Sequence, residues 1–335
     1  MKDLVVRLLD GETLSEAEAG RLVDGLTAED LDPALAAAAL TAMRVRGETA
    51  EELRAFALGL QAKATRPPIS DVATAVDIVG TGGDSSGSLN LSTGAALLAA
   101  AAGVKVIKHG NRSVSSHSGS FDVLAALGLD VPWDPERAAA MFDRTGFTYL
   151  FAPAFHPSMK SVGPVRQTLG SRTIFNLVGP LANPARTPRL VVGAFSPEFA
   201  AMMAETLSGM AIERAFVVHG EPGWDEPTPI GPYLMFDVSP GVVTETTEDP
   251  ADFGFPRCLP EDLVGGDPDS NARAIEAVFK GERGPHRDAL ILGASLAMRL
   301  AGAAPEQAVK AAGATIDDGR AESLLAALST ESADV

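Results

Sequence analysis

Apolar residues recur at helical spacing through the first 66 residues, and no strand pattern interrupts them. Thr13-Leu14-Ser15-Glu16 precedes the apolar series Leu22, Val23 and Leu26, and Ala-rich or Leu-rich helical patterns follow at 35–43 and 49–60. Arg66-Pro67-Pro68 then forms a short, stiff connection. These patterns predict a small helical domain over residues 1–70.

From residue 75 the pattern alternates between short apolar runs and helical stretches. Strand-like runs cover residues 76–79, 104–107, 147–151, 190–195 and 215–218. Helical patterns cover residues 93–102, 121–127 and 197–207, and helices return over 270–328, with amphipathic or buried segments at 288–300 and 305–312. Such alternation is typical of a largely parallel sheet. We therefore predict an α/β domain over residues 71–335, with the loop-rich segment 168–188 crossing between the two parts.

Composition narrows the class of protein. The 335 residues carry a formal net charge of −17, which disfavours general binding to nucleic acid because the phosphate backbone would be repelled. The one cysteine, Cys258, excludes an intrachain disulfide framework and a multi-cysteine zinc site. The most apolar stretch, residues 91–107, is mostly Ala and Gly and contains Lys105, so we read it as core and not as a membrane span. We expect a cytoplasmic protein.

A glycine cluster follows the first predicted strand, in Gly80-Thr81-Gly82-Gly83-Asp84. Glycines at such a point let backbone N–H groups converge on phosphate oxygens, although an ordinary strand-to-loop turn fits the cluster alone equally well. The spacing matches neither the dinucleotide fingerprint nor the P-loop. Residues 83–87 do match the G-x-S-x-G pattern of α/β-hydrolases, but no HGGG-type segment accompanies them and the next helix begins only after Ser92.

Two further segments suit phosphate. Asn90-Leu91-Ser92-Thr93 precedes a predicted helix, where these polar residues could cap the helix, bind an anion at its N-terminus, or divide the two roles. The segment 108–116, KHGNRSVSS, places two cations, an amide and three hydroxyls after the second predicted strand. We favour a phosphate site there over a solvated loop, because basic runs are scarce in this acidic chain. His109 and His117 would be weak evidence alone.

An acid pair, Asp225-Glu226, follows the last predicted strand and a Gly- and Pro-containing loop. Adjacent carboxylates suit Mg²⁺, which prefers carboxylate, phosphate and water oxygens. Two surface acids would be the ordinary interpretation in so acidic a chain. The neighbouring phosphate motifs favour the magnesium interpretation.

The ordered set of motifs resembles the anthranilate phosphoribosyltransferase family, which is related to nucleoside phosphorylases. The matching segments are GTGGD, NLST, KHGNRSVSS, FHPSMKSVGPVRQTLGSRTIFNLVGPLANP and WDE, and the resemblance spans residues 5 to 328. It implies a small all-α domain, joined by the crossover segment 160–188, packed on an α/β phosphoribosyl-binding domain with the active site between them. It also implies a homodimer formed through the helical domain. Leu22, Leu26, Leu35 and Leu40 could contribute to that surface, although an intramolecular core is the more natural place for most of them.

The resemblance implies roles at the matching positions. The residues that would hold phosphoribosyl pyrophosphate are Gly80, Gly83, Asp84, Ser88, Asn90, Ser92, Thr93, Lys108, Ser116 and Ser120. The wider substrate-binding set adds Leu91, Gly110, Arg112, Ser113, Val114 and Ser115. Ser92, Asp225 and Glu226 would hold Mg²⁺. Asn111 and Arg166 would bind anthranilate, with His109, His156 and Gly179-Pro180 along its path, and Lys108, Asn111 and Arg166 would be the catalytic residues.

The implied reaction is displacement at the anomeric carbon of the ribose. The anthranilate amine attacks, pyrophosphate leaves, and N-(5-phosphoribosyl)anthranilate forms, as in tryptophan biosynthesis. Mg²⁺ and Lys108 would stabilise the departing diphosphate, and positioning would supply much of the remainder, because an aromatic amine needs no strong base. We expect no covalent intermediate with the enzyme. The alternatives are the same fold with another aromatic amine as acceptor, or a non-catalytic relative that binds nucleic acid, which should be basic and lack parts of these motifs.

The chain departs from the family pattern at three places. His117 stands where many relatives carry Lys or Arg, and Gly293 stands where the family often has Asn. Pro227 and Pro229 replace the more usual aliphatic-Ser run after the acid pair. Because the prolines could stiffen this segment or shift its carboxylates, they bear directly on the metal site.

Overall fold

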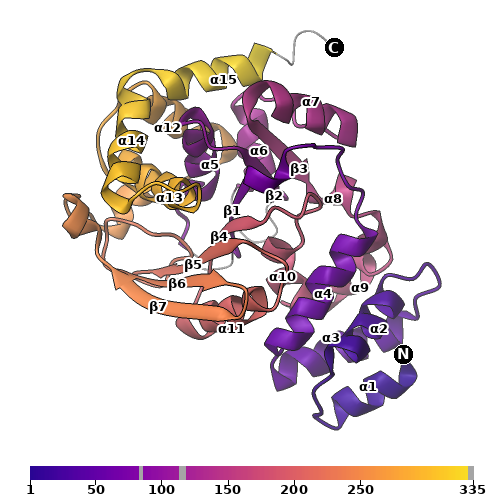
Figure 1. Ribbon diagram of the computed structural model, residues 1–335. Coiled ribbons are helices and arrows are strands. Elements are labelled where there is room, and N and C mark those ends of the chain that lie inside the picture. The colour runs from indigo at the N-terminus through magenta and orange to yellow at the C-terminus, as the bar shows by residue number, and fades with distance from the viewer. Residues whose placement is uncertain (83–85, 113–117, 331–335) are drawn as a thin grey trace.

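A computed structural model describes residues 1–82, 86–112 and 118–330 of the chain. Its first helices are α1 (Lys2–Leu9), α2 (Glu16–Leu26), α3 (Pro33–Arg46) and α4 (Ala50–Lys63), which form a helical unit at one end of the molecule (Figure 1). Asp32 caps α3 by accepting from the N–H groups of Ala34 and Leu35, and Thr49 and Glu52 form a capping box on α4. The presence of a small N-terminal helical domain is confirmed, while its bounds at residues 1 and 70 stay a prediction.

The leucines that were candidates for a dimer surface pack inside this unit. Leu22, Leu26 and Leu40 are fully buried, and Leu35 is partly buried against the same core. The core interpretation of these residues is therefore confirmed, and they do not form an exposed surface.

A seven-stranded sheet forms the centre of the second unit, in the order β3-β2-β1-β4-β5-β6-β7. The strands are β1 (Val76–Gly80), β2 (Val106–Gly110), β3 (Phe147–Phe151), β4 (Arg189–Gly193), β5 (Arg214–Gly220), β6 (Tyr233–Ser239) and β7 (Val242–Glu248). The first five are parallel, as predicted, and β6 and β7 add an antiparallel hairpin that the sequence patterns did not predict. Every residue of β7 except Glu248 is exposed, so no buried face marks it as a strand.

The boundaries of β2 correct one prediction. Residues 108–110 were expected in a loop after the strand, but Lys108, His109 and Gly110 belong to β2 itself, and the first two are buried. Buried polar side chains in a strand need partners from elsewhere in the fold, which a local pattern does not reveal.

Helices cover both faces of the sheet. One face carries α5 (Leu91–Ala101) and α13 (Pro285–Leu300), with α12 (Pro268–Phe279), α14 (Pro305–Asp317) and α15 (Arg320–Thr330) around them. The other face packs on α11 (Pro197–Ser208), which also contacts α4 of the helical unit. The remaining helices are α6 (Ser120–Ala126), α7 (Pro135–Thr145), α8 (Ala152–Phe155), α9 (Gly163–Leu169) and α10 (Ile174–Leu177). The crossover helices α9 and α10 contact α3.

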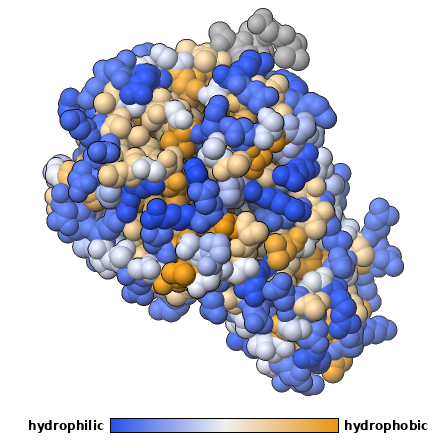
Figure 2. Space-filling view, viewed as in Figure 1, coloured by the Kyte–Doolittle hydropathy of each residue, from blue (hydrophilic) through white to orange (hydrophobic). Residues whose placement is uncertain are grey.

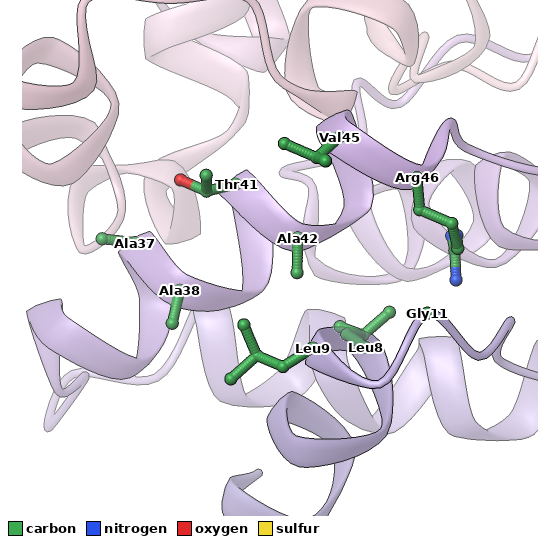
Figure 3. Close-up of a pocket in the computed structure, with 9 residues that line it drawn as sticks. All are labelled: Leu8, Leu9, Gly11, Ala37, Ala38, Thr41, Ala42, Val45 and Arg46. Atoms are coloured by element: carbon green, nitrogen blue, oxygen red, sulfur yellow. The ribbon is translucent and has the colours of Figure 1, made fainter.

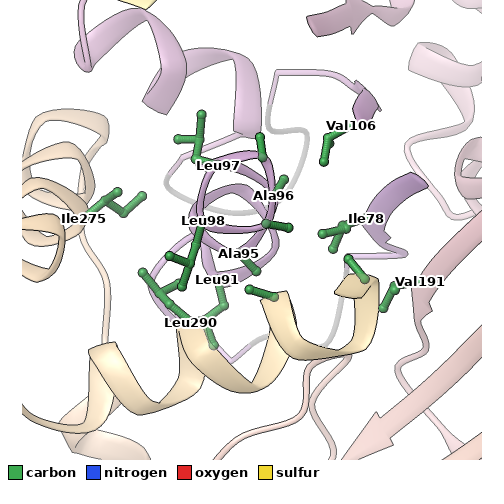
Figure 4. Packing of buried hydrophobic residues seen from close by; sticks show 14 of the residues in the cluster. Ile78, Leu91, Ala95, Ala96, Leu97, Leu98, Val106, Val191, Ile275 and Leu290 are labelled. Carbon is green, nitrogen blue, oxygen red and sulfur yellow. The ribbon is translucent and has the colours of Figure 1, made fainter. Parts of the chain in front are cut away.

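Helices α5 and α13 approach closely because two glycines lie between them. A Cβ on Gly94 would lie 2.7 Å from Leu290 Cδ2, and a Cβ on Gly293 would lie 2.8 Å from the Cβ of Ala95. Leu290 points from α13 toward the buried side chains of α5 (Figure 4). The departure at Gly293 therefore has a packing role: an asparagine in this backbone would push the two helices apart.

The fold class predicted from the sequence, a small helical domain with a larger and mostly parallel α/β domain, is confirmed. Hydrophilic residues cover most of the face in Figure 2, with apolar residues in small patches. Among the described helices, none combines the length and the hydropathy that a bilayer crossing requires.

Candidate active site

Glycines end the strands at one edge of the sheet. Gly80, Gly110, Gly193 and Gly220 are the last residues of β1, β2, β4 and β5. Parallel strands present their carboxyl ends at a common edge, where α/β proteins bind ligands. A Cβ on Gly193 would lie 1.7 Å from the carbonyl oxygen of Asp225, and a Cβ on Gly220 would lie 2.1 Å from that of Glu226. The glycines thus let the acid pair lie directly on the strand ends.

A tight turn delivers the acid pair to this edge. Gly220 and Trp224 exchange backbone hydrogen bonds of 2.9 Å, and the Trp224 side chain is buried. Pro227 and Pro229, the departures that raised doubt about the metal loop, are also buried. The Asp225 carboxylate still points at the end of β1, because a Cβ on Gly80 would lie 2.5 Å from Asp225 Oδ2.

The three predicted magnesium ligands lie together. The Gly82 N–H donates to Asp225 Oδ2 at 2.7 Å, and the Ser92 N–H donates to Glu226 Oε1 at 3.1 Å. Within the described residues no group of three or more His, Cys, Asp or Glu side chains forms a metal cage. Two carboxylates and a hydroxyl suit Mg²⁺, which keeps several water or phosphate ligands of its own.

Lys108 is the buried cation of the site. Its side chain is 2% exposed, and Nζ donates to the carbonyl oxygen of Ile78 and, at 3.4 Å, to Ser92 Oγ. Burial lowers the pKa of Lys108, and the negative charges of Asp77, Glu226 and Asp225 oppose that shift. An ammonium held beside Ser92 and the acid pair can neutralise a bound diphosphate.

The start of α5 lies against the acid pair. Leu91 and Thr93 are buried in its first turn, with Ser92 between them at the surface of the site. Asn90 precedes the helix but makes no side-chain cap, so the capping interpretation of Asn90 is wrong. Its amide instead donates to the Ser118 carbonyl at 3.1 Å and accepts from Asn271 Nδ2 at 2.7 Å. These bonds fix the loop that leads into the helix.

Ser88, at the start of the same loop, bridges to Val264 of a distant segment. A Cβ on Gly265 would lie 2.6 Å from the Ser88 carbonyl oxygen. Residues 263–265 therefore support the loop before α5, which the sequence analysis assigned to the binding of phosphoribosyl pyrophosphate.

The end of β2 gathers further predicted residues. The Ser120 hydroxyl donates to the Asn111 carbonyl at 3.3 Å and is hydrogen bonded to Tyr149 Oη at 2.8 Å. A Cβ on Gly110 would lie 2.5 Å from Ser120 Oγ, so only glycine allows this approach. The Arg112 guanidinium lies 4.5 Å from the centre of the Phe121 ring. The remaining predicted residues Gly83, Asp84, Ser113, Val114, Ser115 and Ser116, and His117, lie outside the described residues.

Two histidines form the wall on the other side of β2. The rings of His109 and His156 meet edge to face with centroids 5.2 Å apart, and both are at least 95% buried. Burial lowers the pKa of His156 to about 4 and that of His109 well below its ordinary value, so both are neutral at pH 7. Among the described residues, His109 Nε2 has no hydrogen-bond partner, while the backbone of Ala182 interacts with the His156 ring and opposes the fall of its pKa. Orphaned buried polar atoms of this kind indicate a place for a ligand or water.

Arg166 completes this side. Its guanidinium lies 5.4 Å from the centre of the Phe175 ring, and burial lowers its pKa. No hydrogen bond or ion pair to its side chain occurs in the described part of the chain. The elements that carry these residues touch: η2 (Pro157–Lys160), which His156 precedes, contacts α9, and η3 (Gly179–Leu181) contacts β2. A forked cation that has a ring contact but no hydrogen-bond or ion-pair partner among the described residues suits a carboxylate.

The sequence analysis missed Asp77 and Asn183. Asp77 lies on β1 and is fully buried, and its carboxylate accepts from the His109 N–H at 3.2 Å and from Asn183 Nδ2 at 2.8 Å. Burial raises the pKa of Asp77 to about 6, while the charge of Lys108 opposes the rise. An acid inside the apolar run Val76-Asp77-Ile78-Val79 was the signal that could have identified it.

Comparison with known proteins identifies the family. The chain matches the helical bundle domain of a glycosyl transferase family over residues 2–64 and its a/b domain over residues 72–322. It is 45% identical over 328 residues to anthranilate phosphoribosyltransferase of Rhodospirillum rubrum, covering 97% of this chain and 94% of that protein. The enzyme of the same name from Rubrobacter xylanophilus is 43% identical over 96% of this chain and 94% of its own length.

Solved structures agree. The crystal structure of anthranilate phosphoribosyltransferase from Thermus thermophilus has a TM-score of 0.91, is 42% identical and covers 98% of each chain. The Saccharomyces cerevisiae enzyme in complex with PRPP and Mg has a TM-score of 0.88 at 24% identity, covers 99% of this chain and 98% of its own, and shares the fold.

Matches to both the helical bundle domain and the a/b domain of one family identify the chain as a glycosyl transferase. With relatives above 40% identity along nearly its whole length, the chain belongs to the anthranilate phosphoribosyltransferase family. The family and the enzyme class predicted from the motifs are confirmed.

Proposed function

We propose that the described site transfers the phosphoribosyl group of phosphoribosyl pyrophosphate to the amine of anthranilate, releasing pyrophosphate, as a step of tryptophan biosynthesis. The observation that carries this proposal is that neighbouring residues of β2 belong to two different half-sites, one around Lys108 for the diphosphate and one around His109 for the acceptor. Lys108 meets Ser92 and the acid pair, and His109 meets His156. The full-length relatives carry the same activity in their names, and the reaction predicted from the sequence is thereby confirmed.

On the donor side, the start of α5 and the glycine loop would hold the phosphates. Besides Lys108, the residues predicted to bind this substrate that the structure describes are Gly80, Ser88, Asn90, Leu91, Ser92, Thr93, Gly110, Arg112 and Ser120. Mg²⁺ held by Ser92, Asp225 and Glu226 would add positive charge to the diphosphate. Lys108 meets the charge that grows on the leaving group, from a buried position where that charge is weakly screened. Gly83, Asp84 and residues 113–116 remain predictions of the sequence.

On the acceptor side, the Arg166 fork would bind the anthranilate carboxylate. Asn111, at the end of β2, would orient the amine, and Gly179-Pro180 would line the entry. Because His109 and His156 are neutral, they would not protonate the aromatic amine, and they offer polar ring atoms without adding charge. The amine attacks as a neutral nucleophile, so the site works by alignment and needs no covalent intermediate.

The domain division also belongs to this proposal. Residues 1–70 with the crossover 160–188 would move as one helical domain against the rest of residues 71–335. The contacts of α9 and α10 with α3 support this division, because they connect the segment that bears Arg166 to the helical unit. Closure between the domains would then bring Arg166 toward the end of β2.

A second copy of the chain is the partner we propose for the helical domain. An apolar groove of about 570 Å³ runs between α1 and α3, lined by Leu8, Leu9, Ala38, Ala42 and Val45 (Figure 3). Leu9 is 64% exposed and Val45 82% exposed. A homodimer would cover this surface. We place the protein in the cytoplasm, with small-molecule substrates and no nucleic-acid partner, which is consistent with its net charge of −17.

The test follows the loss of anthranilate fluorescence with phosphoribosyl pyrophosphate, with and without Mg²⁺. Consumption should require Mg²⁺ and collapse in Arg166→Ala and Asp225→Asn. The exposed residues Arg273 and Asp269 on α12 provide matched controls, and Arg273→Ala and Asp269→Asn should retain full activity. If the wild type binds phosphoribosyl pyrophosphate but leaves anthranilate untouched, the acceptor is another aromatic amine. If it binds neither substrate, the transferase proposal fails.

A further inference from the structure

The sheet opens between β1 and β2 beneath the proposed diphosphate site. Within the described strands, β1 pairs with β4 over five residue pairs and β2 pairs with β3 over five, but β1 and β2 share the single pair Val76–Val106. Backbone groups beyond that pair therefore need other hydrogen-bond partners, since buried N–H and C=O groups are rarely left unpaired.

Three side chains supply those partners. The Asp77 carboxylate of β1 accepts from the backbone N–H of His109 on β2, at 3.2 Å. Asn183 Nδ2 donates to the Ile107 carbonyl of β2 at 2.9 Å, and Lys108 Nζ donates to the Ile78 carbonyl of β1. Asp77 and Asn183 also bond to each other at 2.8 Å and are 0% and 1% exposed. The opening is thus filled by a carboxylate, an amide and an ammonium, and none of them faces water.

This arrangement determines the position of the end of β2 that carries Lys108 and His109. A continuous β1–β2 ladder would use the Ile78 carbonyl, which Lys108 Nζ occupies here. The same network extends to the acceptor side, because Asn183 Oδ1 accepts from the Ala185 N–H at 2.9 Å and so fixes the turn that follows η3 and Gly179. One buried pair therefore connects the Lys108 half-site with the His109 half-site.

We propose that Asp77 and Asn183 are positioning residues of the transfer reaction, which hold β2 away from β1 so that Lys108 meets the diphosphate while the crossover segment stays in place beside His109. The inference rests on the proposed function. It assigns a role to two residues that touch no substrate, and it predicts an effect on catalysis beyond their effect on folding.

The decisive variant is Asp77→Asn, which keeps the shape of the side chain but places an NH2 group against one of the two donors, the Asn183 amide or the His109 N–H. We expect kcat to fall by about ten- to a hundredfold, the range that a displacement of about 1 Å at a reacting group produces. The KM for phosphoribosyl pyrophosphate should change by less than about threefold, because a misplaced ammonium costs most where the leaving charge is largest. Asn183→Ala removes both donors from the other side and should give the same loss of kcat with a higher KM for anthranilate.

Glu52→Gln is the matched control. Glu52 is another carboxylate that is 0% exposed, accepts from the backbone N–H of Leu14 and lies in the helical unit away from Lys108. All three variants should lower Tm, but only those at Asp77 and Asn183 should lower kcat, measured well below every Tm on folded enzyme. If Asp77→Asn, or Asn183→Ala where Asp77→Asn does not fold, keeps kcat within about twofold of the wild type, the pair is structural only and the inference fails. Absence of activity in the wild type would refute the proposed function instead.

Discussion

An alanine at Gly193 would test how closely the acid pair depends on the strand ends. The new Cβ would lie 1.7 Å from the carbonyl oxygen of Asp225, whereas real Cβ contacts below 3.0 Å essentially never occur, so one of the two must retreat by at least about 1.3 Å. β4 cannot yield, because it pairs with β1 and β5 along its whole length. The loop must therefore move, and its carboxylate leaves the Gly82 N–H.

The size of the effect follows from that displacement. A ligand shifted by about 1 Å should cost about a hundredfold in kcat/KM at fixed Mg²⁺. The Mg²⁺ concentration for half-maximal rate should rise at least about tenfold, since one carboxylate is withdrawn from the proposed site. Overpacking costs about 1–3 kcal/mol, and Tm falls by about 2–4 °C per kcal/mol in a domain of this size. The protein should therefore stay folded while the metal response changes.

Gly20→Ala is the control for this experiment. Gly20 lies inside α2, and a Cβ there would meet nothing within 4 Å, so the substitution should stabilise the helix by up to about 1 kcal/mol and leave Mg²⁺ dependence unchanged. The assay is initial rate against Mg²⁺ at saturating substrates, beside a thermal melt of each variant. A Gly193→Ala enzyme whose half-saturating Mg²⁺ lies within about twofold of the wild type would refute the argument from close approach.

Three other predictions address separate parts of the molecule. Arg166→Lys keeps the charge but loses the fork, so the KM for anthranilate should rise about tenfold or more with little change for phosphoribosyl pyrophosphate; an equal rise in both would contradict the assignment. His156 has a folded pKa of about 4 against an ordinary 6.5, so its contribution to stability is complete above pH 6.5 and is lost as pH falls toward 4, by about 3 kcal/mol. Urea titrations between pH 6.5 and pH 4 should therefore show a smaller loss of unfolding free energy for His156→Gln than for the wild type. Parallel curves of unfolding free energy against pH for the two proteins would contradict this prediction. Val45→Glu should yield monomers in analytical ultracentrifugation, and an unchanged mass would exclude the groove as the dimer surface.

The sequence predicted the elements whose burial follows a simple period. The helices of the first unit and the strands β1 to β5 were visible because apolar residues recur on a regular face or in a short run. The hairpin of β6 and β7 was missed because β7 is rich in Thr and Glu and has no buried face. The end of β2 was read as a loop because Lys108 and His109 are polar, and their bonding partners, Ile78 and Asp77, come from another strand.

The site was predicted as a set of segments, and less well as a set of contacts. The ordered motifs placed Ser92, Lys108 and the acid pair in one site, and the structure brings them together. The local rule that makes an asparagine before a helix a cap failed for Asn90, because its amide bonds Asn271, 181 residues further along the chain. Asp77 and Asn183 were missed for the same reason: a pairing across 106 residues leaves no local signal.

The burial of α5 has a consequence for the order in which the chain can fold as it is synthesised. Leu97 and Leu98 are fully buried, and α5 is covered by α13, α14 and α15 from the last 51 residues of the chain. A nascent chain that ends before residue 285 therefore exposes an apolar helix beside the sheet. The turn at its start, which we propose binds phosphate, is held by Val264 and Asn271, but the helix behind it stays exposed until the C-terminal helices leave the ribosome. Until then α5 is a surface for chaperones and for aggregation, so stalling late in translation should be more harmful than stalling early.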